Sequence, residues 1–196
     1  KQALAAAFAT LPREEVRVIS TAAPHVCRES VQHVEDVLDV TQGKLGMGFS
    51  CGSDDMPALL MGNTLFGGSS NSKLFLNVRE KLSLCYYASS LYHRQKGLIT
   101  VSSGIEFQNY QRAYDEIMAQ LEAVQEGELE DWELEGARST LLNSYATVGD
   151  SQGKLENFYL GQAATGQHET PADLARAIQD MTAERICRAM STVKLD

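Results

Sequence analysis

The chain has 196 residues, 43% of them hydrophobic, which is enough for one folded domain with a sizeable core. Its 26 acidic and 17 basic residues give a formal net charge of −9. This balance argues against nucleic acid as a partner, because a phosphate backbone selects for clustered Lys and Arg. No run approaches the roughly 20 apolar residues that cross a bilayer, so we expect no membrane partner.

Cysteine usage indicates a reducing compartment. The cysteines are far apart, form no C-x-x-C pair and resemble neither a zinc knuckle nor a disulfide framework: Cys27, Cys51, Cys85 and Cys187. The opening "KQALAAAFATL" also lacks the features of a signal peptide. We therefore predict a cytoplasmic location.

The first 42 residues predict one short helix and then extended chain. The Ala-rich residues 1–9 favour a helix that stops before Pro12. "EEVRVIS" indicates a strand or a linker that reaches Pro24, and the Val-rich residues 28–42 favour extended structure. We take residues 1–24 as a helix and linker, and residues 25–196 as a single domain.

Residues 43–52, "GKLGMGFSCG", predict a strand whose two faces differ. One face carries Leu45, Met47, Phe49 and Cys51. The other carries Gly46, Gly48 and Ser50, and such small residues allow another backbone or a helix to approach closely.

Two helices are predicted next, joined by a glycine turn. Residues 53–68 have Asp54 and Asp55 near the start, where acidic side chains suit the unpaired amides, and Gly67 or Gly68 is expected to end the helix in the left-handed conformation. Residues 69–82 predict the second helix. Its candidate caps are Ser70, Asn71 and Ser72, and its apolar stripe is Leu74, Phe75, Val78 and Leu82.

The rest of the chain predicts a β-hairpin and then only helices. Residues 84–92 and 98–106 read as strands joined by the loop "HRQKG". The helices follow Asn109, cover 130–146 and 153–165, begin again after the cap pair Thr170-Pro171, and end with 183–190. Antiparallel strands with segregated helices are typical of the α+β class.

Three segments resemble chemical motifs only weakly. "GGSSNSK" lacks the second glycine and the hydroxyl of a phosphate-binding P-loop and follows a helix instead of a strand. His25, Glu29 and His33 are spaced by four, but in an extended segment they lie too far apart to meet at one metal ion. No sequence pattern pairs Cys85 with a His that would activate it as a nucleophile.

The segment "LFGGSSNSKLFLNVREKLSLCYYASS" resembles the F-G-G-G-x-S-S-R-L-F-x-x-V-R-E-K-x-G-L-A-Y-S segment of the pitrilysin/insulinase metallopeptidase family, which includes the mitochondrial processing peptidases. The matching residues are Phe66, Gly67, Gly68, Leu74, Phe75, Val78, Arg79, Glu80, Lys81, Leu84 and Tyr86. The resemblance extends over roughly residues 31–190. It departs from the family at Ser83, Cys85 and Tyr87, where the family has Gly, Ala and Ser.

The resemblance implies an antiparallel sheet with helices mainly on one face. It also implies a division of labour, since family members hold zinc through an H-x-x-E-H helix that this chain lacks. The chain therefore resembles the C-terminal, zinc-free half, with no cofactor of its own and zinc expected in a partner half, in the same polypeptide or in a separate subunit. That half closes over the zinc half and contributes Arg79 and Tyr86 to peptide substrate and to the oxyanion. The loop of Phe66, Gly67, Gly68, Ser69 and Ser70 is the expected peptide-binding segment.

Two alternatives remain open at this point. The chain could be a non-catalytic peptide-binding or scaffold subunit of a two-chain processing peptidase, since some family members are inactive subunits. It could also be a free-standing hydrolase that uses Cys85.

Overall fold

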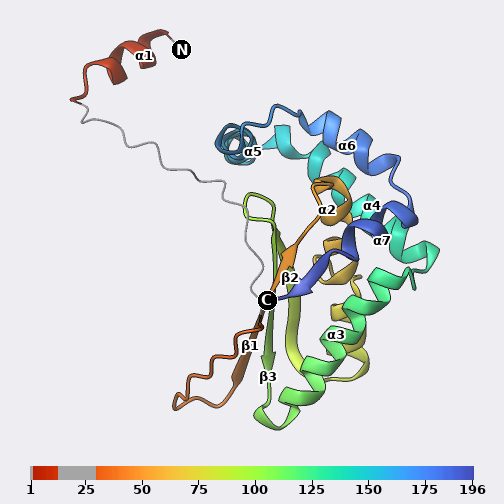
Figure 1. Ribbon diagram of the computed structural model, residues 1–196. Helices are drawn as coiled ribbons and strands as arrows, with labels where there is room; N and C mark the ends of the chain where they lie inside the picture. The colour runs from red at the N-terminus through yellow and green to blue at the C-terminus, as the bar shows by residue number, and fades with distance from the viewer. Residues whose placement is uncertain (1, 13–29) are drawn as a thin grey trace.

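Figure 1 shows a computed structural model of the chain, which describes residues 2–12 and 30–196. In chain order its elements are α1 (Gln2–Ala9), β1 (Gly43–Cys51), α2 (Met56–Phe66), the π-helix η1 (Leu74–Lys81), β2 (Cys85–His93), β3 (Leu98–Ile105), the 3₁₀-helix η2 (Phe107–Asn109), α3 (Tyr110–Glu126), α4 (Asp131–Ala146), the 3₁₀-helix η3 (Val148–Asp150), α5 (Gln152–Thr165), α6 (Pro171–Gln179), α7 (Ala183–Met190) and β4 (Val193–Leu195). None of the described helices is long and apolar enough to cross a membrane.

The strands form one antiparallel sheet in the order β2-β3-β1-β4. The predicted hairpin pairs β2 with β3, and β1 lies beside β3 with Met47 opposite Val101. β4 pairs with Phe49–Cys51 of β1. The sequence did not predict β4, because three residues are too few to show a period of two.

The helices that follow β1, from α2 to α7, lie on one side of this sheet (Figure 1). Leu45, Met47 and Phe49 of β1 point into the layer between sheet and helices and are buried. On the opposite face, a Cβ added to Gly46 or Gly48 would meet nothing within 4 Å. The α+β fold with helices mainly on one face is confirmed, and within the described chain the glycine face of β1 is open instead of closely packed.

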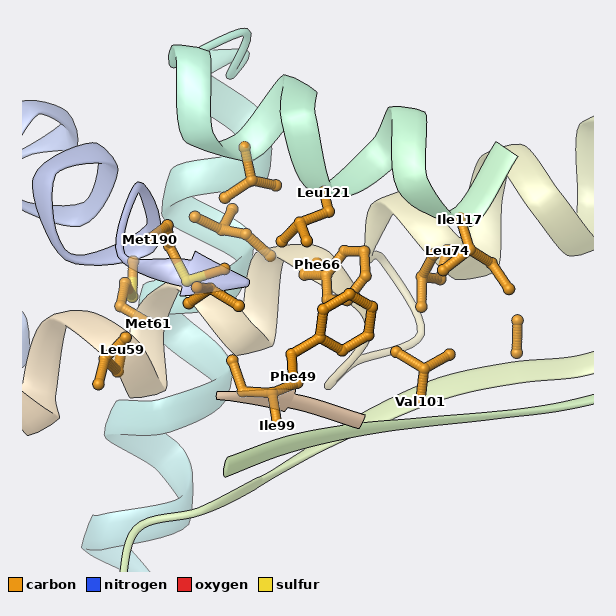
Figure 2. Close-up of a cluster of buried hydrophobic side chains, with 14 of the residues drawn as sticks. Phe49, Leu59, Met61, Phe66, Leu74, Ile99, Val101, Ile117, Leu121 and Met190 are labelled. Carbon is orange, nitrogen blue, oxygen red and sulfur yellow. The ribbon is translucent and has the colours of Figure 1, made fainter. Parts of the chain in front are cut away.

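The core lies between the sheet and α2, α3 and α7 (Figure 2). Phe49 and Phe66 are 0% exposed, and their rings meet edge to face with 6.3 Å between centroids. The large side chains packed around these two rings are Leu59, Met61, Leu74, Ile99, Val101, Ile117, Leu121 and Met190. This cluster fixes α2, and therefore the glycine turn that follows it, against the sheet.

Most helix ends follow the sequence signals. The Asp55 side chain caps α2 by accepting a hydrogen bond from the Ala58 amide at 3.3 Å. Thr170 forms a capping box with Asp173 at the start of α6. Gly127 ends α3 in the left-handed conformation, with φ of 81°. These ends depend on contacts between neighbours in sequence, which is why they could be predicted.

Three local predictions are wrong or incomplete. Neither Gly67 nor Gly68 ends α2 in the left-handed conformation, because φ of Gly67 is −154° and the positive-φ glycines lie elsewhere. The predicted helix 69–82 is instead a π-helix over Leu74–Lys81, and Leu82, predicted on its apolar stripe, follows the helix and is 37% exposed. Residues 30–42 form no helix or strand. "EEVRVIS", His25, Glu29 and the domain boundary at residue 24 lie outside the described residues.

Candidate functional site

The glycine turn after α2 is attached to the edge of β2. The amides of Gly67 and Gly68 both donate to the carbonyl of Asn63, at 2.9 and 2.8 Å. The Gly67 carbonyl accepts from the Ser90 amide at 2.9 Å, and a Cβ on Gly67 would lie 2.7 Å from that same nitrogen. Glycine is therefore needed at position 67 for close approach of two backbones, not for a left-handed turn.

The predicted peptide-binding segment divides between core and surface. Phe66 and Gly67 are buried, whereas Gly68 and Ser70 are exposed and Ser69 is half-buried. The buried Phe66 side chain is therefore part of the core next to the turn. Only Gly68, Ser69 and Ser70 lie where a peptide could contact them.

η1 follows this turn and carries Arg79 at its far end. Its defining hydrogen bond runs from the Leu82 amide to the Asn77 carbonyl at 3.1 Å, a spacing of five residues. Leu74 and Val78 bury its inner side. π-helices are rare and occur frequently at functional sites.

The guanidinium of Arg79 is held by three contacts. Its Nε donates to the backbone carbonyl of Tyr86 at 3.1 Å, and its Nη1 lies 3.3 Å from Glu80 Oε1. Its Cζ lies 4.7 Å from the centroid of the Phe75 ring. The side chain is still 39% exposed, so the group is oriented but accessible.

Tyr86 lies on a distorted strand start. Ser83, which stands where the family has Gly, has φ of 49°. The pairing register of β2 shifts between Cys85 and Tyr87, so Tyr86 is the extra residue of a β-bulge and is 52% exposed. The neighbouring Tyr87 is differently placed, because its hydroxyl lies 3.2 Å from Ser102 Oγ.

Arg79 and Tyr86 line one cavity of about 370 Å³. Its other lining residues are Glu80, Ser83, Leu84, Cys85 and Glu106. Glu106 Oε2 accepts hydrogen bonds from Gln108 at 3.0 Å and from Asn109 at 3.3 Å. The structure therefore brings together the two predicted site residues and adds Glu106, which sequence reasoning missed because it lies at the end of a different strand.

Cys85 also lines the cavity but is poorly suited to be a nucleophile. Burial raises the pKa of its thiol above the ordinary value, and the Ser103 hydroxyl and Arg79 oppose this only in part. The thiol is therefore protonated at neutral pH, and the thiolate is the reactive form. His93, at the other end of β2, bonds Thr100 Oγ1 at 3.0 Å.

The described residues offer no cluster for a metal ion, and the lysine of the P-loop-like segment is already paired. No group of three or more His, Cys, Asp or Glu residues there could hold a metal ion. The lysine of "GGSSNSK", Lys73, is 8% exposed and its ammonium bonds both oxygens of Glu133, at 3.0 and 3.1 Å. That lysine is already neutralised and is not available to a phosphate.

Comparison with known proteins identifies the family. Residues 1–141 match the peptidase M16 inactive domain. The chain belongs to the peptidase M16 family. This confirms the pitrilysin/insulinase resemblance, and it assigns the chain to the type of domain described as inactive.

Two proteins of Bacillus subtilis strain 168 are similar in sequence. The probable inactive metalloprotease YmfF is 39% identical over 175 residues, which cover 86% of this chain and 41% of that protein. The uncharacterized zinc protease YmxG is 23% identical over 154 residues, which cover 76% of this chain and 38% of that protein. The chain thus spans less than half the length of either relative.

Solved structures share the M16 domain fold. A conserved protein from Enterococcus faecalis V583 matches with a TM-score of 0.86 and 28% identity, over 100% of this chain and 48% of its own. A peptidase M16 inactive domain from Pseudomonas fluorescens matches with a TM-score of 0.68 and 19% identity, over 79% of this chain and 38% of its own. At that lower identity the likeness shows the fold alone.

Proposed function

We propose that this M16 domain is the zinc-free half of a peptidase, which closes over a zinc-bearing half and stabilises the transition state of peptide-bond hydrolysis. The observation that supports this most is the convergence of Arg79 and Tyr86 on one cavity, with the guanidinium fixed to the Tyr86 backbone at 3.1 Å. A guanidinium held in this way loses little freedom when substrate arrives.

The two side chains suit different parts of the reaction. The zinc of the partner half would supply an activated water that attacks the peptide carbonyl. Negative charge then develops on the carbonyl oxygen, and the exposed phenol of Tyr86 is a donor that stabilises it. The unshared N–H groups of Arg79 bind a neighbouring carbonyl or carboxylate of the peptide, and Gly68, Ser69 and Ser70 offer further polar contacts.

The test uses the assembled protein, with its zinc-bearing half, and a library of internally quenched fluorescent peptides. We expect Arg79→Ala and Tyr86→Phe to lower kcat about 10²–10³-fold, the usual loss for a stabilising donor. Tyr87→Phe is the matched control, because that hydroxyl already bonds Ser102. Turnover within about twofold of the wild type for both variants would refute a transition-state role.

The second candidate is a non-catalytic peptide-binding or scaffold subunit of a two-chain processing peptidase. It is favoured by the description of the Bacillus subtilis relative as a probable inactive metalloprotease. In that case Arg79→Ala would weaken binding of long peptides and leave cleavage of short peptides unchanged. A cysteine hydrolase would instead lose activity when Cys85 is alkylated. The raised pKa of the Cys85 thiol argues against a cysteine hydrolase. Cytoplasmic location stays a prediction.

A further inference from the structure

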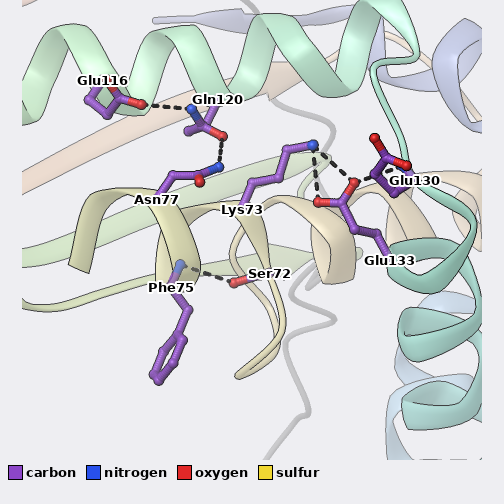
Figure 3. A network of polar contacts seen from close by, with 8 residues as sticks. All are labelled: Ser72, Lys73, Phe75, Asn77, Glu116, Gln120, Glu130 and Glu133. Atoms are coloured by element: carbon purple, nitrogen blue, oxygen red, sulfur yellow. Dashed lines mark hydrogen bonds and ion pairs between the residues drawn. The ribbon is translucent and has the colours of Figure 1, made fainter. Parts of the chain in front are cut away.

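The π-helix η1 is held by two polar contacts on its inner side (Figure 3). At its start, the Lys73 ammonium bonds both carboxylate oxygens of Glu133 on α4. Four residues on, Asn77 Nδ2 donates to Gln120 Oε1 of α3 at 2.6 Å. We refer to these two contacts as the η1 anchors.

In each anchor, the partner side chain, Glu133 or Gln120, is itself oriented by a second hydrogen bond. Glu133 Oε2 also accepts from the Glu130 amide at 2.9 Å, as part of the capping box that starts α4. Gln120 Nε2 donates to Glu116 Oε1 at 2.7 Å, one turn back along α3. Both anchors therefore tie η1 to long helices.

Stability alone does not explain the first anchor. Lys73 and Glu133 are 8% and 6% exposed, and a buried ion pair is on average no more stabilising than well-packed apolar residues of similar volume. What such a pair adds is directional geometry. The adjoining apolar residues Leu74 and Val78 already bury η1 against the core.

Two anchors four residues apart define the twist of the helix between them. A π-helix turns less per residue than an α-helix, because its hydrogen bonds span five residues instead of four. Relaxation of Leu74–Lys81 to an α-helix would therefore rotate the later residues of η1 relative to its start. Such a rotation would move Arg79 away from the Tyr86 carbonyl that it now bonds.

We propose that the η1 anchors are positioning contacts: Lys73–Glu133 and Asn77–Gln120 keep η1 in its π register and so hold Arg79 at the peptide site. This inference rests on the proposed function of Arg79. Lys73, Asn77, Gln120 and Glu133 are not catalytic residues, because none of them lines the cavity.

The experiment measures kcat and KM of the assembled protein on the quenched-peptide library for Lys73→Met and Gln120→Leu. We expect kcat to fall about tenfold to a hundredfold with KM within twofold, as for a small displacement of a group that stabilises the transition state. Lys73→Arg can still form a charge-assisted, bidentate contact with Glu133 and should recover kcat to within about threefold. Gln120→Leu also serves if Lys73→Met does not fold, since it buries no unpaired charge.

Two controls separate positioning from simple stability. Arg185→Met breaks another inter-helix ion pair, with Asp55, and should lower the melting temperature without changing kcat. Gln111→Leu breaks a comparable bond on α3, to Asp115, and should change neither. In addition, Lys73→Met made on top of Arg79→Ala should lower kcat no further, because the group that it positions is already gone.

The outcomes distinguish this inference from the function on which it rests. If Arg79→Ala lowers kcat while folded Lys73→Met and Gln120→Leu do not, the anchors are merely structural and the inference is overturned. Additive losses in the Lys73→Met and Arg79→Ala double variant overturn it too. If Arg79→Ala leaves turnover unchanged, the proposed function itself falls.

Discussion

Phe66 provides a direct test of whether the start of the glycine segment is core or binding surface. Its ring is 0% exposed and meets the equally buried ring of Phe49 edge to face. Phe66→Ala removes a fully buried aromatic side chain and leaves a cavity, which we expect to lower the free energy of unfolding by about 3–5 kcal/mol. Phe66→Leu loses the ring pair, worth about 1 kcal/mol, and a small residual cavity, so the expected cost is about 1–2 kcal/mol.

The free energy of unfolding is measured by urea unfolding of the purified protein, and the melting temperature by heating it. Both transitions are followed by circular dichroism. A domain of this size loses about 2–4 °C of melting temperature per kcal/mol, so Phe66→Ala should melt about 6–20 °C lower. Phe107, which is 61% exposed, offers the matched control, and Phe107→Leu should stay within about 0.5 kcal/mol of the wild type.

Peptide binding supplies the second readout for Phe66. Phe66→Leu should leave the affinity for peptide unchanged at a temperature where the variant is folded. The reasoning would be refuted if Phe66→Ala cost less than about 1 kcal/mol. It would equally be refuted if Phe66→Leu weakened peptide binding at unchanged stability, because that result belongs to a surface contact.

Two further predictions concern the glycines and the pH dependence of stability. Gly67→Ala places a Cβ 2.7 Å from the Ser90 backbone nitrogen, so we expect a loss of about 2 kcal/mol or more in urea unfolding. Gly48→Ala has open space and should be neutral or stabilising by up to about 0.5 kcal/mol; equal losses for both would contradict the close-approach argument. The hydrogen bond from Arg185 lowers the pKa of Asp55, so this contribution to stability is complete above the ordinary carboxyl value and disappears as pH falls below about 4. Unfolding midpoints measured from pH 5 downward should therefore fall less steeply in Arg185→Met than in the wild type, and parallel curves would show that the pair contributes nothing.

The local sequence was sufficient for most elements because their signals lie within a few residues. Alternation of Leu45, Met47 and Phe49 against glycines identifies a strand with one buried face, and the structure confirms that burial. The Thr170-Pro171 pair identifies the start of α6 through a capping box that spans three residues. The long motif around Arg79 was specific enough to indicate the family.

Local signals failed where a distant backbone decides the conformation. Glycine is needed at position 67 because the backbone of Ser90 lies so close to it. Ser90 is on β2, which is separated from Gly67 in the chain by η1. The π register of η1 is likewise invisible in a helical pattern, because spacings of three, four and five residues overlap over eight residues.

The α+β class, the three longer strands in their chain order, and the segment that carries Arg79 and Tyr86 could all be predicted from the sequence. The class and the strands follow from the periodicity and capping of neighbouring residues, whereas Arg79 and Tyr86 stand out only through the resemblance to the pitrilysin/insulinase family. Which groups surround that pair depends on the packing of the sheet and helices. Glu133 meets Lys73 across 60 residues of sequence, and Glu106 reaches the cavity from the end of β3. Side chains on separate elements become neighbours only when sheet and helices pack together. A local sequence pattern cannot predict which of them will be in contact.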